Sequence, residues 1–381
     1  MIKSFKYRIH PNKSQEVLLS KTFGCIRIIW NANVESFNSY DKDNNPKPKL
    51  ISKSDLINDK PWLNEVSAAA IQQKIRDFKE TTSQFFSKTR KKKINKPVFK
   101  KKSGNQSYRL PNQKFLINGN KIRLEKIGWV KMSVDRIIPD NCKIVSCTIS
   151  KNCCNQYFVS ISVDAIIYHK PKTGKSVGVD LGLKSFATLS DNVVIDNIKF
   201  FREKQSEIVK IQKYLSRKRK GSNRYRKNKL RIARLHNKIA NKRNDFLHNT
   251  TTYLVNNYDV ICIEDLNVSG MLSNHKLAKA ISDTSFHQFR SILEYKCNWY
   301  GKELVIIDRF YPSSKTCSKC GWKKEDLTLS DRVFKCENCG VEIDRDLNAA
   351  INIERIGVDI LCNRMQRDEV TNPVEASKIE W

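Results

Sequence analysis

Apolar and polar residues alternate near the start of the chain and again in its middle third, with the period of β-strands. The residues from Phe5 to Ile9 place every second side chain on one apolar face. The same period returns over several segments between Phe115 and Val163. The Asn118-Gly119 pair within them is typical of a type I′ hairpin turn, whose two central residues need positive φ. We therefore expect a small antiparallel barrel that includes the first strand.

Two segments inserted between these strands carry apolar residues at helical spacing. The first begins after Pro11 and runs through Trp30, and the second covers Ser67 to Phe86. The run 88–102 that follows holds nine basic residues and no acidic one. Such a run is either a solvated loop or an arm that contacts phosphates, and Lys91, Lys92 and Lys93 are our candidates for the second role.

The second half of the chain alternates strands and helices, as an α/β domain does. We expect strands at 176–181, 186–195 (a hairpin), 259–264 and 303–309, and helices at 201–256 and 284–300. The long basic helical stretch breaks at Gly221-Ser222, which predicts an αα hairpin. Its tip supplies three further candidates for nucleic-acid binding: Arg217, Arg219 and Arg224. A polar linker at 168–175 marks the main domain boundary.

Composition favours a nucleic-acid partner. The 381 residues include 39% hydrophobic ones, enough for two or three domains with cores of their own. Lys and Arg number 71 against 39 Asp and Glu, a formal net charge of +32, which is the sign that phosphate backbones attract. Binding to an acidic membrane would need an amphipathic anchor or an apolar stretch of about 18 residues, and we find neither, nor a signal peptide. We expect a cytoplasmic, nucleoid-associated protein without a membrane partner.

Four cysteines have the spacing of a zinc site. Cys317 and Cys320 form one short pair, and Cys336 and Cys339 form a second after fifteen residues. Four thiolates at such intervals make a tetrahedral cage for Zn²⁺, the alternative being four unrelated reduced thiols. Because sulfur fills all four positions, the zinc would be structural. The other eight cysteines suggest no disulfide framework.

Three acidic residues stand at places where a lone charge needs compensation. Asp180 and Glu264 each follow an apolar strand pattern, and Asp346 lies at the entrance to a helix. Each has an ordinary explanation: Asp180 as a turn residue, Glu264 as the partner of an Arg or the start of a loop, Asp346 as a favourable charge at a helix N-terminus. Together they could hold one or two Mg²⁺ ions, which activate water and stabilise the leaving oxygen of a phosphodiester.

Several motifs resemble the TnpB family, also called OrfB, of bacterial insertion sequences and its Fanzor relatives. They run nearly from end to end and include the opening Phe5-Lys-Tyr-Arg-Ile-His10, Glu264-Asp-Leu-Asn267, Tyr311-Pro-Ser-Ser-Lys-Thr-Cys317 and Asp344-Arg-Asp-Leu-Asn-Ala-Ala350. The family is similar to type V CRISPR effectors and uses a guide RNA from its transposon to cut DNA. The resemblance implies that Asp180, Glu264 and Asp346 are the catalytic acids.

The resemblance also implies a multidomain α+β architecture: a wedge β-barrel with an inserted helical domain, then a ribonuclease H-like (RuvC) α/β domain with an inserted zinc ribbon. On this sequence we expect the wedge barrel at 1–14 and 96–170, the helical recognition domain at 15–95, the RuvC-like domain at 171–310 and 342–358, the zinc ribbon at 311–341 and a C-terminal tail at 359–381.

We expect an RNA-guided, magnesium-dependent DNA endonuclease of a transposable element, a monomer or weak dimer with structural zinc, a guide RNA and a double-stranded DNA target. One alternative is a catalytically inactive relative that acts as a repressor or an RNA-binding module. Another is a nucleotide phosphotransferase on the same scaffold, which does not explain the charge of +32.

Overall fold

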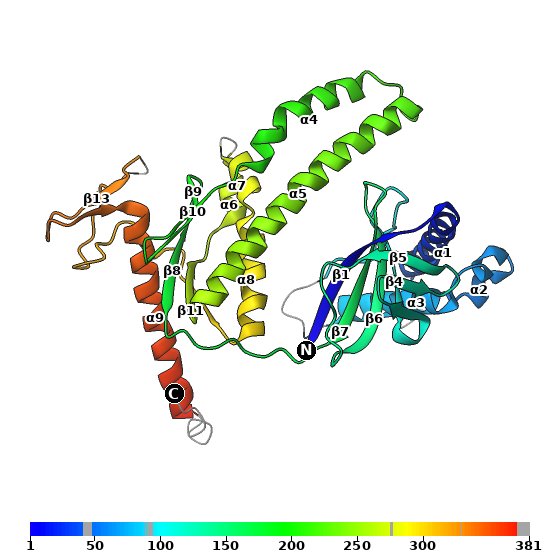
Figure 1. The fold of residues 1–381 in the computed structure, drawn as a ribbon, viewed down its shortest axis with the longest axis horizontal. Coiled ribbons are helices and arrows are strands. Elements are labelled where there is room, and N and C mark those ends of the chain that lie inside the picture. Colours follow the sequence, from blue (N-terminus) through cyan, green and yellow to red (C-terminus); the bar gives the residue numbers. More distant parts are fainter. Residues whose placement is uncertain (41–47, 88, 90–93, 275–276, 329, 372–381) are drawn as a thin grey trace. The chain divides into compact units, whose positions relative to one another are not determined.

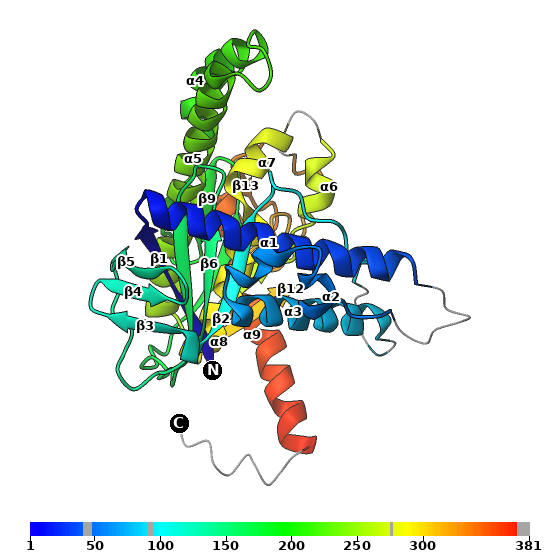
Figure 2. The same ribbon diagram turned by 90° about the vertical axis from the view of Figure 1, so that its right-hand side faces the viewer.

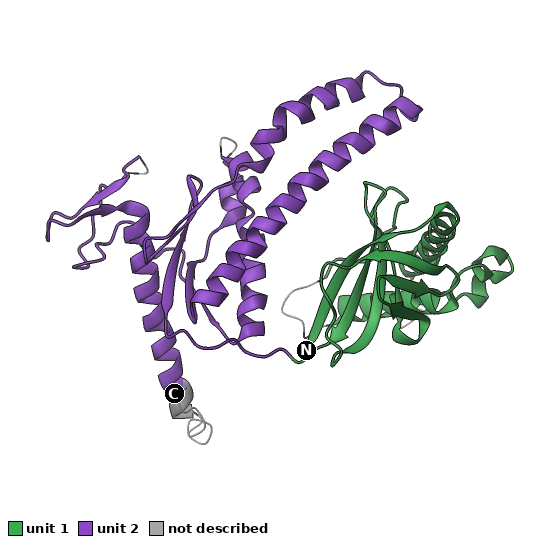
Figure 3. Ribbon diagram, viewed as in Figure 1, with its two compact units in different colours: residues 1–166 green, residues 167–381 purple. Residues whose placement is uncertain are grey.

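The computed structural model describes residues 1–40, 48–87, 89, 94–274, 277–328 and 330–371, the last four of these by their backbone alone. The chain divides into two compact units, residues 1–166 and 167–381 (Figure 3). Each unit has its own sheet. None of the helices in the described ranges is both long enough and apolar enough to span a membrane.

Unit 1 is built on a seven-stranded sheet in the order β2-β6-β7-β1-β5-β4-β3, in which all neighbours are antiparallel. Its strands are β1 (Ile2–His10), β2 (Gln106–Pro111), β3 (Phe115–Asn118), β4 (Lys121–Leu124), β5 (Gly128–Ser133), β6 (Lys143–Lys151) and β7 (Tyr157–Asp164). The first strand belongs to this sheet, as predicted, and it lies in the middle of the strand order. β2 and β3 are its edges, so the strand pairing among the described residues does not close into a complete barrel.

The hairpin turn between β3 and β4 lies one residue later than predicted. Asn118 pairs with Lys121, which makes Gly119 and Asn120 the two central residues. Of these only Gly119 has positive φ, at 52°. Glycine at the first central position is the requirement of a type II′ turn, so the predicted type I′ turn centred on Asn118-Gly119 is wrong in register.

The helices of unit 1 are α1 (Lys13–Asn38), α2 (Ser54–Ile57) and α3 (Ala68–Phe86). α1 and α3 begin where the sequence predicted, because Asn12 and Ser67 accept hydrogen bonds from backbone N–H groups of their first turns. α1 and α3 lie next to each other (Figure 2). The rings of Trp30 and Phe78 meet edge to face at 5.2 Å and join the two helices.

Unit 2 is built on a five-stranded sheet in the order β10-β9-β8-β11-β12. Its strands are β8 (Ser176–Leu181), β9 (Ser185–Leu189), β10 (Val194–Asp196), β11 (Val260–Glu264) and β12 (Glu303–Ile307). β8, β11 and β12 are parallel, whereas β9 is antiparallel to both of its neighbours. All these strands lie close to their predicted positions.

One face of this sheet is covered by α5 (Asn223–Asn257) and α8 (Phe286–Tyr300), whose apolar residues share a core with Val177, Val179 and Ile263. α4 (Phe200–Ser216) and α5 form the predicted αα hairpin, which extends away from the sheet (Figure 1). Ser222 caps α5 by accepting the N–H of Tyr225 at 3.1 Å. Two short helices, α6 (Val268–Leu272) and α7 (Ala278–Thr284), precede α8.

The opposite face is covered by α9 (Arg345–Thr371), which runs alongside β8 (Figure 1). Ile353 and Leu361 pack there on Cys262 and the apolar side chains of β12. The first part of the predicted C-terminal tail at 359–381 lies within this helix, which continues to Thr371. Ile353, Gly357 and Leu361 recur every four residues and form the face that meets the sheet.

Candidate active site and cysteine cluster

Asp180 and Glu264 lie side by side at the ends of two parallel strands. Val179 of β8 is the register partner of Ile263 of β11, so the next residue of each strand is the carboxylic acid. Neighbouring strands are about 4.8 Å apart, and side chains alternate between the faces of a sheet. Asp180 therefore shares the face of Gly178, and Glu264 shares the face of Cys262. That is the face covered by α9.

α9 runs antiparallel to β8 and brings Asp346 to the same end of the sheet. Ser176 donates a hydrogen bond to Glu354, and Gly178 lies directly against the backbone of Ala350. Each step of two strand residues, about 6.6 Å, matches a step of four helix residues, about 6.0 Å. Two residues beyond Gly178 in β8 is Asp180, and four residues before Ala350 in α9 is Asp346. The same spacing therefore places Asp346 opposite Asp180.

The carboxylates of Glu264 and Asp346 act on that of Asp180. Burial and then the carboxylates of Asp346 and Glu264 raise the pKa of Asp180 to about 7, against a smaller opposing effect of Arg345. Burial, and after it the charge of Asp265, raises the pKa of Glu264. The three carboxylates are nevertheless farther apart than the sulfurs of the cysteine cluster, which among the described residues is the only group of three or more His, Cys, Asp or Glu side chains whose ligand atoms all lie within 4.8 Å of one another. In this structure Asp346 accepts a hydrogen bond from Arg345 at 3.1 Å.

Two acids of the Asp344-Arg-Asp346 motif have different roles. Asp344 Oδ1 accepts the backbone N–H groups of Asp346 at 2.9 Å and Leu347 at 3.1 Å. Asp344 is thus the N-cap of α9, and its carboxylate is occupied by the helix. The carboxylate of Asp346 does not cap the helix; it accepts hydrogen bonds from the Arg345 side chain and acts on the pKa of Asp180.

Residues that the sequence reasoning missed surround Glu264. Asp265 forms ion pairs with Arg290 and Arg309. Hydrogen bonds, first from Arg309 and then from Arg290, lower the pKa of Asp265. A cavity of about 160 Å³ lies beside Glu264 and is lined by residues that include Arg290, Arg309 and His287. Nothing in the spacing of these residues along the chain announces that they meet.

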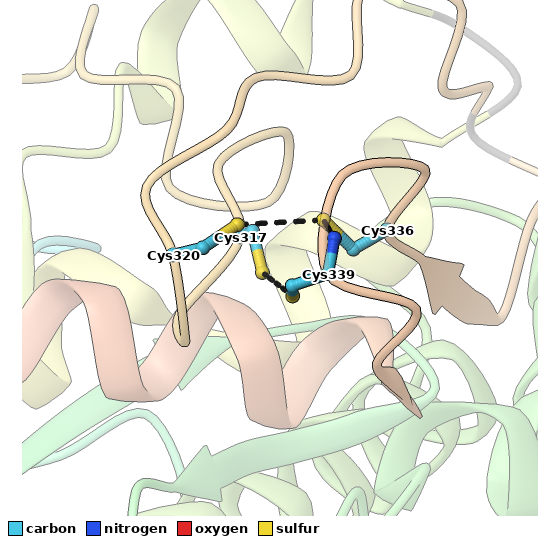
Figure 4. A group of neighbouring side chains, drawn as sticks. All are labelled: Cys317, Cys320, Cys336 and Cys339. Atoms are coloured by element: carbon cyan, nitrogen blue, oxygen red, sulfur yellow. Dashed lines mark hydrogen bonds between the residues drawn. The ribbon is translucent and has the colours of Figure 1, made fainter.

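The four predicted cysteines come together in a small loop pair (Figure 4). One pair follows Thr316, and the other lies between β13 (Val333–Lys335) and β14 (Glu342–Asp344). Sγ of Cys317 lies 3.7 Å from that of Cys339, and Sγ of Cys320 lies 3.5 Å from that of Cys336. Sulfurs at about 2.3 Å from a tetrahedral Zn²⁺ are about 3.8 Å apart, so the cluster has the dimensions of a zinc site.

Each cysteine pair is followed by a glycine in the left-handed region, Gly321 with φ 77° and Gly340 with φ 69°. These glycines let each loop turn back after its second sulfur. Buried side chains of α9 fasten the first loop: Asn348 donates to the carbonyl of Thr316 at 2.7 Å and Asn352 donates to that of Ser313 at 2.8 Å. The cluster is therefore joined to the helix that carries Asp346.

The candidate nucleic-acid contacts are in part beyond what the structure describes. Lys91, Lys92 and Lys93 lie outside the described residues. Arg217, Arg219 and Arg224 are exposed at the tip of the hairpin formed by α4 and α5 (Figure 1). Exposed arginines on a projecting hairpin are a suitable surface for phosphate groups.

Comparison with protein families gives three matches. The IS605 OrfB family, described as "Probable transposase", matches residues 156–275. A domain described as "Cas12f1-like, TNB domain" matches residues 286–353, which include α8, the cysteine cluster and the start of α9. A domain described as "Helix-turn-helix domain" matches residues 1–36, which in this chain form β1 and most of α1.

Relatives match over nearly the whole chain. A protein of Streptomyces pristinaespiralis named "Putative RNA-guided DNA endonuclease" is 35% identical over 93% of this chain and 89% of its own length. The Escherichia coli K12 protein "Putative RNA-guided DNA endonuclease InsQ" is 30% identical over 96% of this chain and 94% of its own. Among solved structures, the Cas12f1-sgRNA-target DNA complex is similar in fold, with a TM-score of 0.53, 13% identity, and coverage of 93% of this chain and 98% of that one.

Proposed function

This chain belongs to the TnpB family, and we propose on that ground that it is an RNA-guided, Mg²⁺-dependent DNA endonuclease of a transposable element. The observation that carries the proposal is the meeting of Asp180, Glu264 and Asp346 at one end of the sheet of unit 2. The three acids come from two neighbouring strands and from the helix that covers them.

The sheet of unit 2 supports a ribonuclease H-like assignment. Numbered along the chain, its strands lie in the order 3-2-1-4-5, with the second strand antiparallel to the others. The first and fourth strands are central neighbours, and each carries one of the acids at or next to its C-terminal end. This topology is the one expected for a RuvC-like nuclease domain, as the family resemblance implies.

The acid group suits a divalent cation. Burial first, and then the nearby carboxylates of Asp346 and Glu264, raise the pKa of Asp180 against a smaller opposing effect of Arg345. Carboxylate oxygens are the ligands that Mg²⁺ prefers. When bound, magnesium ions would activate a water and stabilise the leaving oxygen of a phosphodiester. The chain's own part is to hold Asp180, Glu264 and Asp346 in fixed positions at the end of the sheet.

The cysteine cluster would hold zinc in a structural role, because its four sulfurs leave no position for water or substrate. Its contribution to the reaction is indirect. The hydrogen bonds of Asn348 and Asn352 connect the cluster to α9, so an ordered cluster helps to fix the helix whose first turn carries Asp346.

The partners of the proposed nuclease are a guide RNA and a double-stranded DNA target. The net charge of +32 and the exposed arginines of the α4–α5 hairpin support binding to phosphate backbones. A guide RNA is also consistent with the names of the relatives, both of which contain the words "Putative RNA-guided DNA endonuclease".

The test uses the full-length protein purified together with its RNA. The RNA is sequenced, a supercoiled plasmid that carries the complementary sequence is added with Mg²⁺, and wild type is compared with Asp180→Ala and with the exposed-acid control Asp140→Ala. We expect wild type and the control to linearise the plasmid, and Asp180→Ala to bind it without cutting. A wild-type protein that retards the plasmid but never nicks it would instead be a binding module.

A further inference from the structure

Asp265 holds two arginines that come from different parts of unit 2. Its Oδ1 accepts a hydrogen bond from Nη1 of Arg290 on α8 at 2.5 Å, and its Oδ2 accepts one from Nη2 of Arg309 after β12. The backbone N–H of Asp265 donates to the carbonyl of Ile307 at 3.2 Å. One carboxylate therefore fixes two guanidinium groups, and the three side chains together keep a net charge of +1.

The two guanidinium groups still have donors for another acceptor. Each carries five N–H groups in a planar fork, and the contact with Asp265 uses few of them. Their side chains are 39% and 41% exposed, so the groups are accessible. Both line the cavity of about 160 Å³ that also includes Glu264. Arg290 and Arg309 therefore share the lining of one cavity with Glu264, whereas Asp180 and Asp346 are not among its lining residues.

An exposed aromatic ring follows directly after Arg309. Phe310 is 85% exposed, although a side chain of this kind is normally covered. Its backbone N–H donates to the carboxylate of Asp308 at 2.7 Å, which fixes the turn that presents the ring. Aromatic rings beside a positive groove are typical of sites that stack the bases of single-stranded nucleic acid.

We propose that Arg290 and Arg309 bind a backbone phosphate of the single strand that enters the acid site, and that Phe310 stacks on one of its bases. Asp265 is the positioning residue that holds both arginines. This inference rests on the proposed function, because it takes the DNA strand to be the substrate of the acids. Neutralisation by guanidinium groups lets a phosphodiester approach carboxylates that would otherwise repel it.

A purely structural role is the rival explanation, since the same ion pairs tie β11, α8 and β12 together. The two roles predict opposite effects for Asp265→Asn. If Asp265 only holds the elements together, its loss should be as harmful as the loss of either arginine. If the arginines bind phosphate, Asp265→Asn removes a competing negative charge and leaves strand affinity equal or higher, while the rate of cleavage falls because the arginines lose their fixed position.

Affinity is measured by fluorescence anisotropy with short single-stranded DNA, in full-length protein that carries Asp180→Ala so that nothing is cut. We expect Arg290→Gln and Arg309→Gln each to weaken binding about tenfold and to lower the slope of log affinity against log salt by about 0.7. Phe310→Ala should weaken binding without changing that slope. Arg309→Lys keeps the charge and should retain the slope. Arg364→Gln, at an exposed ion pair with Glu303 in the same unit, is the control and should change nothing.

Cleavage kinetics without the Asp180→Ala change separate this inference from the proposed function. We expect Arg290→Gln to raise KM for the DNA with a much smaller change in kcat. Arg290→Gln and Arg309→Gln proteins that keep the affinity and the salt slope of the Asp180→Ala parent would overturn the inference. An Asp265→Asn protein that binds DNA as weakly as we expect of the two arginine variants would overturn it as well. A wild type that never cleaves would overturn the proposed function, while the binding measurements would still decide the role of the arginines.

Discussion

Gly178 of β8 lies directly against the backbone of α9 at Ala350. A Cβ atom on Gly178 would stand 2.6 Å from the amide nitrogen of Glu354 and even closer to the carbonyl oxygen of Ala350. No side chain can occupy this position unless the helix moves. The distance between the strand that carries Asp180 and the helix that carries Asp346 is thus set by a residue without a side chain.

Gly178→Ala should destabilise unit 2 by about 3 kcal/mol, because the new methyl group would meet backbone atoms that cannot rotate away. It should also slow cleavage, since α9 is displaced together with Asp346. The measurement is the thermal unfolding midpoint with a parallel cleavage assay. Gly24→Ala is the control: Gly24 lies within α1, a Cβ there has its nearest neighbour at 4.0 Å, and alanine is the better helix former. Equal unfolding midpoints for the two variants would contradict the close packing of α9 on β8.

Asp180→Asn should stabilise the metal-free protein in a pH-dependent way. The pKa of Asp180 is raised to about 7 in the fold, above the value of about 3.9 for an unfolded chain. Between these values the folded state holds a proton that the unfolded state has lost, so the associated stability is present at low pH and disappears as pH rises through about 7. An asparagine side chain does not titrate, so the Asp180→Asn protein does not lose this stability as pH rises.

In EDTA, the unfolding midpoint of Asp180→Asn minus that of wild type should therefore be small near pH 4.5 and grow towards pH 8. Added Mg²⁺ should raise the midpoint of wild type more than that of the variant, because the cation balances the charge that the variant lacks. A difference between the two proteins that stays constant across this pH range would argue against the crowded carboxylates.

Asp344 and Asp346 should respond differently to substitution although they are two residues apart. Asp344→Ala removes the N-cap of α9 and should lower stability by about 1 kcal/mol, with some cleavage retained. Asp346→Ala should abolish cleavage and leave the unfolding midpoint nearly unchanged. Urea unfolding and plasmid cleavage of both variants test this. The reverse pattern would show that the two roles are exchanged.

Zinc should copurify at about one ion per chain, as measured by elemental analysis of the dialysed protein. Cys336→Ser should lose the metal and lower the unfolding midpoint, because the ligands must be held together for the loop pair to fold. Cys153→Ser, at an exposed cysteine outside the cluster, is the control. Wild-type metal content in Cys336→Ser would contradict the four-sulfur site.

The sequence predicted those features that depend on local patterns. The apolar runs before Asp180 and Glu264 identified both strands and the position of each acid at a strand end. The Cys-x-x-Cys spacing identified the cluster, and apolar residues at helical spacing after Pro11 and from Ser67 onward identified the starts of two helices. In each case a short stretch of chain contains the whole signal.

Other features depend on segments that are far apart in sequence. Asp265, Arg290 and Arg309 meet only because β11, α8 and β12 fold together, so no spacing reveals them. The extension of α9 had a signal, the four-residue recurrence of Ile353, Gly357 and Leu361, but a glycine within it conceals the helical face. That glycine is needed because Cys262 leaves no room for a Cβ, which would lie 2.6 Å from the Cβ of Cys262.

The central claim is that Asp180, Glu264 and Asp346 act together in metal-dependent cleavage. The most direct measurement is the single-turnover rate of target cleavage by the RNA-bound protein in Mg²⁺, compared among wild type, Asp180→Asn, Glu264→Gln and Asp346→Asn. We predict that each single substitution lowers the rate by more than about a hundredfold, since loss of a supporting group alone has about that effect, while each protein still binds the target. A rate close to wild type in any one of the three variants would contradict the account.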